Sequence, residues 1–283
     1  MNIFERLQHI DRRIMYALLV VAIAAPLIWR INLPVVVTPA VRGVYDTFDK
    51  MPADKIALIV VYWGAGTVAE TGPETAAMMR QLFMQNKKFA LLPFDPQGSK
   101  FATDSAKALA KEYGKKYGID WVHWGYQPIS NLVPLLQSFP GNIKGTFRTD
   151  AYGTPMDKIP MMRNVNTLRD IGVVADITSS GELDTWIAYV QATYRDAKGR
   201  YRVPMVYGPT AIIAPEGFNA LDAGQIQGML MGMKGAAEYE KLLSAEGFAT
   251  RAAGALSTSH LLIVVLIILG NIGYVMSRRR GEG

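Results

Sequence analysis

Hydrophobic and polar positions along the middle of the chain follow two alternating patterns. Continuous apolar runs rich in β-branched residues occupy 55–64, 88–94, 120–126 and 171–177, with further runs at 202–208 and 210–215. Such runs are typical of strands that are buried on both faces of a parallel sheet. Longer segments with helical spacing separate them. The sequence therefore predicts an open, mostly parallel α/β sheet of the doubly wound, Rossmann-like kind, flanked by helices.

Short polar patterns indicate where these helices begin. Capping boxes are expected at Thr71 to Glu74 and at Ser179 to Glu182, and single caps at Thr103 and Asn219. Residues 140–168 lack either periodicity, and such a long irregular segment is uncommon in a compact domain. We expect a functional loop there, or a short hairpin that the pattern conceals.

A glycine-rich stretch at 223–243, AGQIQGMLMGMKGAAEYEKLL, is predicted to form one helix. Gly224, Gly228 and Gly232 would share one face of it, although glycine costs about 1 kcal/mol relative to alanine inside a helix. Two interpretations remain open. The small residues let the helix lie close against its own sheet, or this face, or the opposite face with Met229 and Met233, docks another subunit.

Both ends of the chain carry apolar segments beside arginines. We expect transmembrane helices at 14–33 and 256–276, an amphipathic interfacial helix at 1–13, and a basic tail at 277–283. The positive-inside rule places both termini in the cytoplasm. Residues 35–250 then form an extracytoplasmic α/β domain on the inner (cell) membrane. The alternatives are a cleavable signal peptide ending near Ala22-Ile23-Ala24, or two buried helices of a soluble protein.

The positions of the charges argue against nucleic-acid binding. The net charge is +6, but residues 1–30 hold four basic and two acidic residues, and the segment after His260 holds three basic and one. The long middle region, 31–259, has 23 basic and 21 acidic residues. Its surface is therefore mixed, and the excess arginines at the ends orient the chain in the membrane.

The residue types exclude several chemistries. The chain has no cysteine, which rules out disulfides, thiolate catalysis and cysteine-based metal sites. It also lacks a nucleophile elbow, a phosphate-binding loop with its Lys-Ser/Thr, and a His-Glu-x-x-His zinc motif. The sequence accordingly predicts no catalytic residue, no metal and no cofactor.

Candidate ligand-binding residues follow the predicted strands, because ligands of such sheets bind beyond the carboxyl ends of the strands. Each has an ordinary structural alternative: a plain strand-to-helix turn for the glycines, a buried structural role for the only histidine of the domain, and capping or solvation for the others. These candidates are Gly64, Gly66, Asp95, His123, Asp176, Ser179 and Glu216.

These features favour a non-catalytic role. The first hypothesis is a membrane-anchored structural or interaction subunit of an oligomeric membrane complex, with the lipid bilayer, copies of itself or other subunits as partners. The alternative is an extracytoplasmic small-ligand sensor, or a hydrolase-type enzyme, that uses the strand-end loops. The two differ in one observable: whether Asp95, His123, Asp176 and Glu216 face a single pocket.

Overall fold

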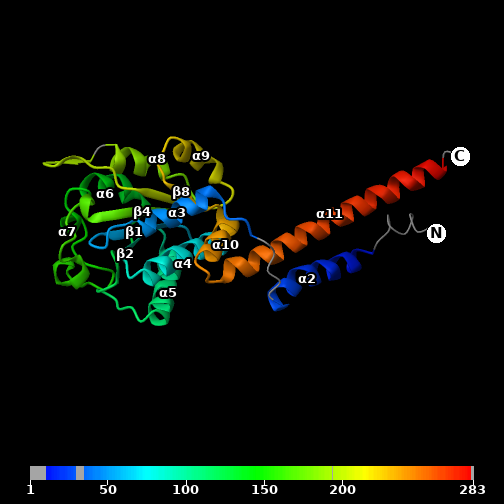
Figure 1. The fold of residues 1–283 in the computed structure, drawn as a ribbon, viewed down its shortest axis with the longest axis horizontal. Coiled ribbons are helices and arrows are strands. Elements are labelled where there is room, and N and C mark those ends of the chain that lie inside the picture. Colours follow the sequence, from blue (N-terminus) through cyan, green and yellow to red (C-terminus); the bar gives the residue numbers. More distant parts are fainter. Residues whose placement is uncertain (1–10, 30–34, 193, 282–283) are drawn as a thin grey trace. The chain divides into compact units, whose positions relative to one another are not determined.

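The computed structural model describes residues 11–29, 35–192 and 194–281 (Figure 1). The chain divides into two compact units, one formed by Met1–Val35 with Glu246–Gly283 and the other by Val36–Ala245. The predicted interfacial segment at 1–13 lies outside the described residues except for its last three positions, as does Arg30.

A six-stranded parallel sheet forms the centre of the Val36–Ala245 unit, which confirms the α/β prediction. Every residue of the two central strands is buried, as their continuous apolar sequence requires. The strand order is β3-β2-β1-β4-β7-β8. Strands β2 and β3 are added on one side of β1, and β4, β7 and β8 on the other side, which is the pattern of a doubly wound sheet. The strands are β1 (Ile56–Tyr62), β2 (Lys88–Pro93), β3 (Trp121–His123), β4 (Ile171–Thr178), β7 (Met205–Pro209) and β8 (Gly228–Met229).

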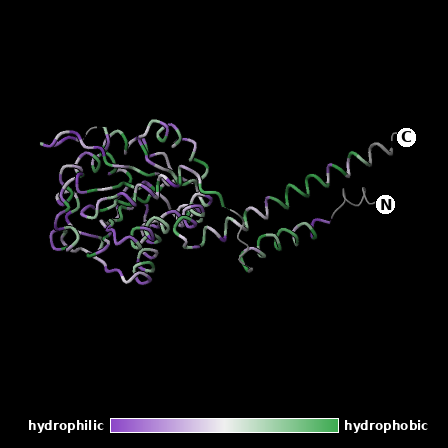
Figure 2. The backbone as a smooth tube through the Cα atoms, in the orientation of Figure 1, coloured by the Kyte–Doolittle hydropathy of each residue, from purple (hydrophilic) through white to green (hydrophobic). Residues whose placement is uncertain are grey.

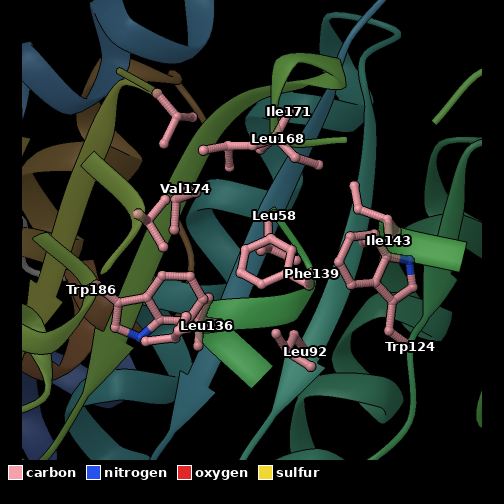
Figure 3. Packing of buried hydrophobic residues seen from close by; sticks show 14 of the residues in the cluster. Leu58, Leu92, Trp124, Leu136, Phe139, Ile143, Leu168, Ile171, Val174 and Trp186 are labelled. Carbon is pink, nitrogen blue, oxygen red and sulfur yellow. The ribbon is translucent and has the colours of Figure 1, made fainter. Parts of the chain in front are cut away.

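Helices cover both faces of this sheet. Alternate residues of each strand point to opposite faces, so Leu58 and Ile59 enter two different apolar clusters. One face is covered by α3 (Pro39–Asp49), α4 (Val68–Met84), α5 (Pro96–Glu112) and α10 (Gly232–Leu242). The other face, shown in Figure 3, is covered by α6 (Leu132–Ser138), α7 (Ile143–Thr146), α8 (Leu183–Trp186) and α9 (Ala214–Asp222).

Short elements complete the unit. A π-helix, Ile187–Gln191, continues α8, and a small antiparallel hairpin joins β5 (Arg195–Asp196) to β6 (Gly199–Arg200). Between 140 and 168 the chain forms α7, 3₁₀ turns at Met156–Lys158, Pro160–Met162 and, at its end, Leu168–Asp170, and one isolated antiparallel bridge between Thr149 and Pro155. A further 3₁₀ turn, Ile129–Asn131, precedes α6. The long irregular segment packs its apolar residues against the sheet, and the Thr149–Pro155 bridge is the part of it that corresponds to the short hairpin expected from the sequence.

Several predicted helix starts are wrong. Helix α4 begins at Val68, and Thr71 is an interior residue whose hydroxyl donates to the Thr67 carbonyl. Helix α5 begins at Pro96 and is capped by Asp95, so Thr103 lies inside it. Glu182, with no capping bond from its side chain, occupies the N-cap of α8. A strand was also predicted at 210–215, where the structure has a turn and the start of α9.

The predicted single helix at 223–243 is wrong as well. Gly224 follows the end of α9 with a φ of +65°, Gly228 lies in β8, and Gly232 opens α10 with a φ of +55°. A Cβ at Gly228 would lie within 2.7 Å of backbone atoms of α3. Asn219 lies inside α9 and caps nothing. The glycines therefore permit left-handed turns and one close backbone contact within this chain, and Gly228, Met229 and Gly232 are buried there.

The other unit consists of two helices, α2 (Arg12–Trp29) and α11 (Phe248–Gly281). Among the described residues, α11 is the one helix long and apolar enough to cross a membrane, over the 29 residues from Phe248 to Met276. Figure 2 shows hydrophobic residues along both helices. The Thr258 hydroxyl of α11 donates a 2.6 Å hydrogen bond to the Ala22 carbonyl of α2. The candidate span found among the described residues corresponds to the one predicted at 256–276, and the one predicted at 14–33 is not shown.

Candidate functional site

A cavity of about 630 Å³ opens at the carboxyl ends of β2 and β3. Its lining comes from one face of α5, from the residues that follow β3, and from the irregular segment near 150. The lining residues include Ser99, Lys100, Thr103, Asp104, Lys107, His123, Tyr126, Gln127, Thr149, Asp150 and Tyr152.

The local sequence fixes α5 as one wall of this cavity. The Asp95 carboxylate caps the helix by accepting a 2.7 Å hydrogen bond from the Gly98 amide. Gly98 packs directly on the Trp63 carbonyl, where any larger residue would collide with it. Ser99, Thr103 and Lys107 are four residues apart and thus share the helix face that lines the cavity.

His123 is buried at the end of β3 and bonds at both ring nitrogens. Nδ1 lies 2.9 Å from the Gly125 amide, and Nε2 lies 3.0 Å from the Ser99 hydroxyl oxygen. A backbone amide can only donate, so Nδ1 must be the acceptor and the neutral ring must carry its proton on Nε2. Burial lowers the pKa of His123 to about 4, which keeps the ring neutral near pH 7.

This tautomer determines what Ser99 can do. Since Nε2–H donates to the Ser99 oxygen, the hydroxyl proton of Ser99 is left to donate into the cavity. A serine nucleophile needs the opposite arrangement, with the imidazole accepting its proton. Asp150 does not complete a catalytic triad, because its carboxylate accepts hydrogen bonds from the amides of Tyr152 and Thr154 and from the Tyr117 hydroxyl.

The charged side chains that line the cavity are two lysines, Lys100 and Lys107, and two aspartates, Asp104 and Asp150. The Lys100 ammonium is paired with the Asp104 carboxylate at 2.6 Å. The Lys107 ammonium lies 5.6 Å from the centre of the Tyr152 ring, a cation–π contact. Within the described part of the chain, no carboxylate lies within ion-pair distance of Lys107. The pKa of Asp104 is lowered first by its hydrogen bond from Lys100 and to a smaller extent by the charge of Lys107.

No protein-family model matches this chain, nor does any curated protein or solved structure. The geometry of the cavity is therefore the basis for assigning it a function.

The place where such sheets usually bind ligands, between the ends of β1 and β4, is filled by side chains of the chain itself. Tyr62 stacks on Phe94 with ring centres 4.3 Å apart. The Trp186 indole N–H donates a 3.2 Å hydrogen bond to the Tyr62 hydroxyl. All three side chains are buried, so the cavity that remains lies to one side, over β2 and β3.

Asp176 lies beneath this aromatic plug and is fully buried. Neither of its carboxylate oxygens has a hydrogen-bond partner among the described residues. Burial raises the pKa of Asp176 well above its usual value of 3.8, and the nearby Glu182 carboxylate raises it further. Glu74, on the opposite face of the sheet, is also fully buried, and burial and then Glu70 raise its pKa.

The seven candidates from the sequence do not converge on one pocket. His123 lines the cavity, whereas Asp95 caps α5, Asp176 is enclosed, and Glu216 lies in the first turn of α9. The remaining three occupy turns: Ser179 donates to the Tyr62 carbonyl, Gly64 lies beside Asp95, and Gly66 has open space around it.

Most cavity residues were absent from the sequence candidates. The polar stripe of Ser99, Thr103 and Lys107 has helical spacing, and an N-cap at Asp95 would have placed it at a strand end. Asp150 and Tyr152 come from an irregular segment distant in sequence, so periodicity carries no signal for them. In the residues that the structure describes, no group of three or more histidine or acidic side chains is suited to hold a metal ion.

Proposed function

We propose that this chain is a membrane-anchored, non-catalytic receptor subunit whose α/β domain binds a small anionic ligand. The observation that carries the proposal is the strand-end cavity, which Ser99 and Lys107 both line. The Ser99 oxygen accepts from His123, which leaves its own proton for another acceptor, and no carboxylate among the described residues lies within ion-pair distance of Lys107. Its volume of about 630 Å³ falls within the range of natural ligand pockets.

The donor set suits carboxylate or phosphate oxygens. An ammonium and a hydroxyl donor on the same helix face bind an anionic oxygen more strongly than a neutral one, since charge-assisted hydrogen bonds are about twice as strong. Tyr126 and Tyr152 are 43% and 55% exposed and give the cavity an aromatic rim. The ligand would therefore combine an anionic group with a small apolar or ring portion.

A hydrolase is the less favoured alternative. The His123 ring donates to Ser99 and, with its pKa lowered to about 4, is too weak a base to take the serine proton. The proposal therefore combines the two hypotheses from the sequence: it keeps the non-catalytic role of the first and adopts small-ligand binding from the second.

The membrane arrangement is part of the proposal. Residues 14–33 and 256–276 would both span the inner membrane, with cytoplasmic termini and an extracytoplasmic domain. The apolar side chains that α2 exposes, including Val20, Val21 and Ile28, support a lipid-facing helix. The Thr258–Ala22 hydrogen bond supports packing of the two helices, because polar side chains in a bilayer find partners on neighbouring helices.

Isothermal titration calorimetry tests the ligand class, with inorganic phosphate, succinate and glucose as probes of the full chain in detergent. We expect at least one anion to bind and glucose not to bind. Lys107→Gln and Ser99→Ala should each weaken the anion about tenfold, while Lys111→Gln, on the same helix but outside the cavity, should not. Equal affinity of Lys107→Gln and the unaltered chain would refute the proposed site.

A further inference from the structure

The β5–β6 hairpin concentrates positive charge on a domain whose surface is otherwise mixed. Arg195, Lys198, Arg200 and Arg202 are all exposed, and none forms an ion pair with another described residue. The only acid of the hairpin, Asp196, is neutralised by a 2.5 Å ion pair with Arg169. In Figure 1 the hairpin is the yellow-green finger that projects beyond α8.

Three hydrogen bonds hold this hairpin in place. Arg169 donates to the Gly199 carbonyl at 2.7 Å, and the Tyr201 hydroxyl donates to the Ile171 carbonyl at 3.0 Å. Lys55 donates to the Tyr201 hydroxyl at 3.0 Å and lies over the same ring. The four exposed cations are thus presented on a fixed support, which lowers the entropic cost of binding an anionic partner.

A second cavity, of about 460 Å³, lies at the foot of the hairpin. Leu136, Tyr189 and Tyr194 form part of its wall, and Arg195 belongs both to this wall and to the hairpin. Tyr189 comes from the π-helix, where the Ala192 amide donates to the Ile187 carbonyl five residues earlier. Such π-turns occur frequently at functional sites.

We propose that the hairpin and this cavity together bind an acidic peptide segment of a partner protein. Its carboxylates would pair with Arg195, Lys198 and Arg200, and one apolar side chain would enter the cavity between Tyr189 and Tyr194. This site is separate from the strand-end cavity and does not depend on the function proposed for it.

The geometry favours a peptide over the other polyanions. The hairpin tip consists of Ala197, Lys198 and Gly199, so it has no large apolar side chain to insert into a lipid surface. Its aromatic residue, Tyr201, is held between Lys55 and Arg169 and is not free to stack on a base. An adjoining cavity lined by tyrosines suits a side chain next to acidic residues.

Fluorescence anisotropy with the full chain in neutral phosphatidylcholine nanodiscs tests this proposal. The probe is a short glutamate-rich peptide with one central phenylalanine. We expect binding that weakens with added salt, and about tenfold weaker binding for Lys198→Glu, Arg200→Glu and Gly141→Leu, the last of which adds a side chain to the cavity wall. Lys111→Glu, a matched charge reversal on α5, should leave the affinity unchanged.

Two altered peptides separate the roles of charge and cavity. Replacing glutamate by glutamine should abolish binding, and replacing the phenylalanine by glycine should weaken it about tenfold. The proposal is overturned if the glutamine peptide binds equally well or if Lys111→Glu weakens binding as much as Lys198→Glu. It is also overturned if a single-stranded oligonucleotide or anionic vesicles bind as tightly as the peptide and compete with it.

Discussion

At the scale of single residues, the backbone amide of Gly125 decides the chemistry of His123. Because this amide donates to Nδ1, the ring donates from Nε2 to the Ser99 oxygen. The proton of the Ser99 hydroxyl is therefore left for another acceptor. The sequence left two interpretations open for His123, ligand binding or a buried structural role, and the structure places it on β3 with both nitrogens engaged. The Ser99 contact depends on how α5 packs beside β3, which no local pattern encodes.

We expect the His123 ring to stay neutral from pH 8 down to pH 5, because burial lowers its pKa to about 4. Carbon-bound proton shifts in the NMR spectrum of the folded protein should be constant over that interval, and the ring nitrogens should report the Nε2–H tautomer. The denatured chain, whose histidines titrate near the usual 6.5, is the control. A titration midpoint near 6.5 in the folded state would contradict the assigned hydrogen bonds.

The buried carboxyl of Asp176 gives a prediction about how the stability of the domain depends on pH. Its pKa is raised in the folded state, so the unfolded chain loses this proton first as pH rises above the usual 3.8. Asp176 therefore contributes stability at low pH that is lost as pH rises toward the folded-state pKa. Asp176→Asn removes this loss, and we expect it to flatten the fall in unfolding free energy as pH rises above 3.8.

Denaturant unfolding at several pH values measures this effect. The pKa of Glu74 is also raised by burial, so Glu74 contributes separately to the fall in unfolding free energy with pH. The double variant with Glu74→Gln should therefore show a still smaller fall. Asp54→Asn, at an exposed position, is the matched control and should follow the unaltered chain. If Asp176→Asn shows the original slope, the carboxyl is not protonated in the folded state.

At the scale of elements, strands were easier to predict than the ends of helices. The runs that became β1, β2 and β4 are apolar because both faces of each strand are buried, so the signal lies in the strand itself. Helix starts depend on which of several polar residues meets a free amide. The sequence predicted Thr103 as the cap of α5, but the helix begins earlier, where Asp95 accepts from the Gly98 amide and Gly98 packs on the Trp63 carbonyl.

The glycine-rich stretch shows the same limit more strongly. The spacing of four residues suggested one face of a helix. The glycines instead permit two left-handed turns and the close contact between β8 and α3. Tertiary approach of one backbone to another leaves no periodic trace in the sequence. The interpretation of close packing within the chain thus holds for Gly228, although the element is a strand.

We expect Gly228→Ala to destabilise the domain by about 1–3 kcal/mol, since its Cβ would collide with the backbone of α3. Gly66→Ala is the matched control, because nothing lies within 4 Å of a Cβ there. Thermal unfolding compares the two, and size-exclusion chromatography follows assembly. Unchanged melting with a smaller assembled species would instead point to a contact between subunits.

At the scale of the whole molecule, the fold and the site were predictable to different degrees. Binding beyond the carboxyl ends of parallel strands is a general rule, and the cavity obeys it. The rule does not say which strand ends stay open. The site between the ends of β1 and β4 is closed by Tyr62, Phe94 and Trp186. These side chains come from three separate segments, so the spacing of residues in the sequence does not predict that they meet.

The absence of cysteine makes the proposed topology directly testable. We expect Ala108→Cys, at an exposed position of α5, to react with a membrane-impermeant maleimide in intact spheroplasts, because the α/β domain is proposed to be extracytoplasmic. Ser277→Cys, immediately before Arg278, Arg279 and Arg280, should react only after the membrane is permeabilised. The unaltered chain is an unlabelled control. Labelling of Ser277→Cys from outside would mean that α11 crosses in the reverse direction or not at all, and protection of Ala108→Cys would move the ligand cavity to the cytoplasm.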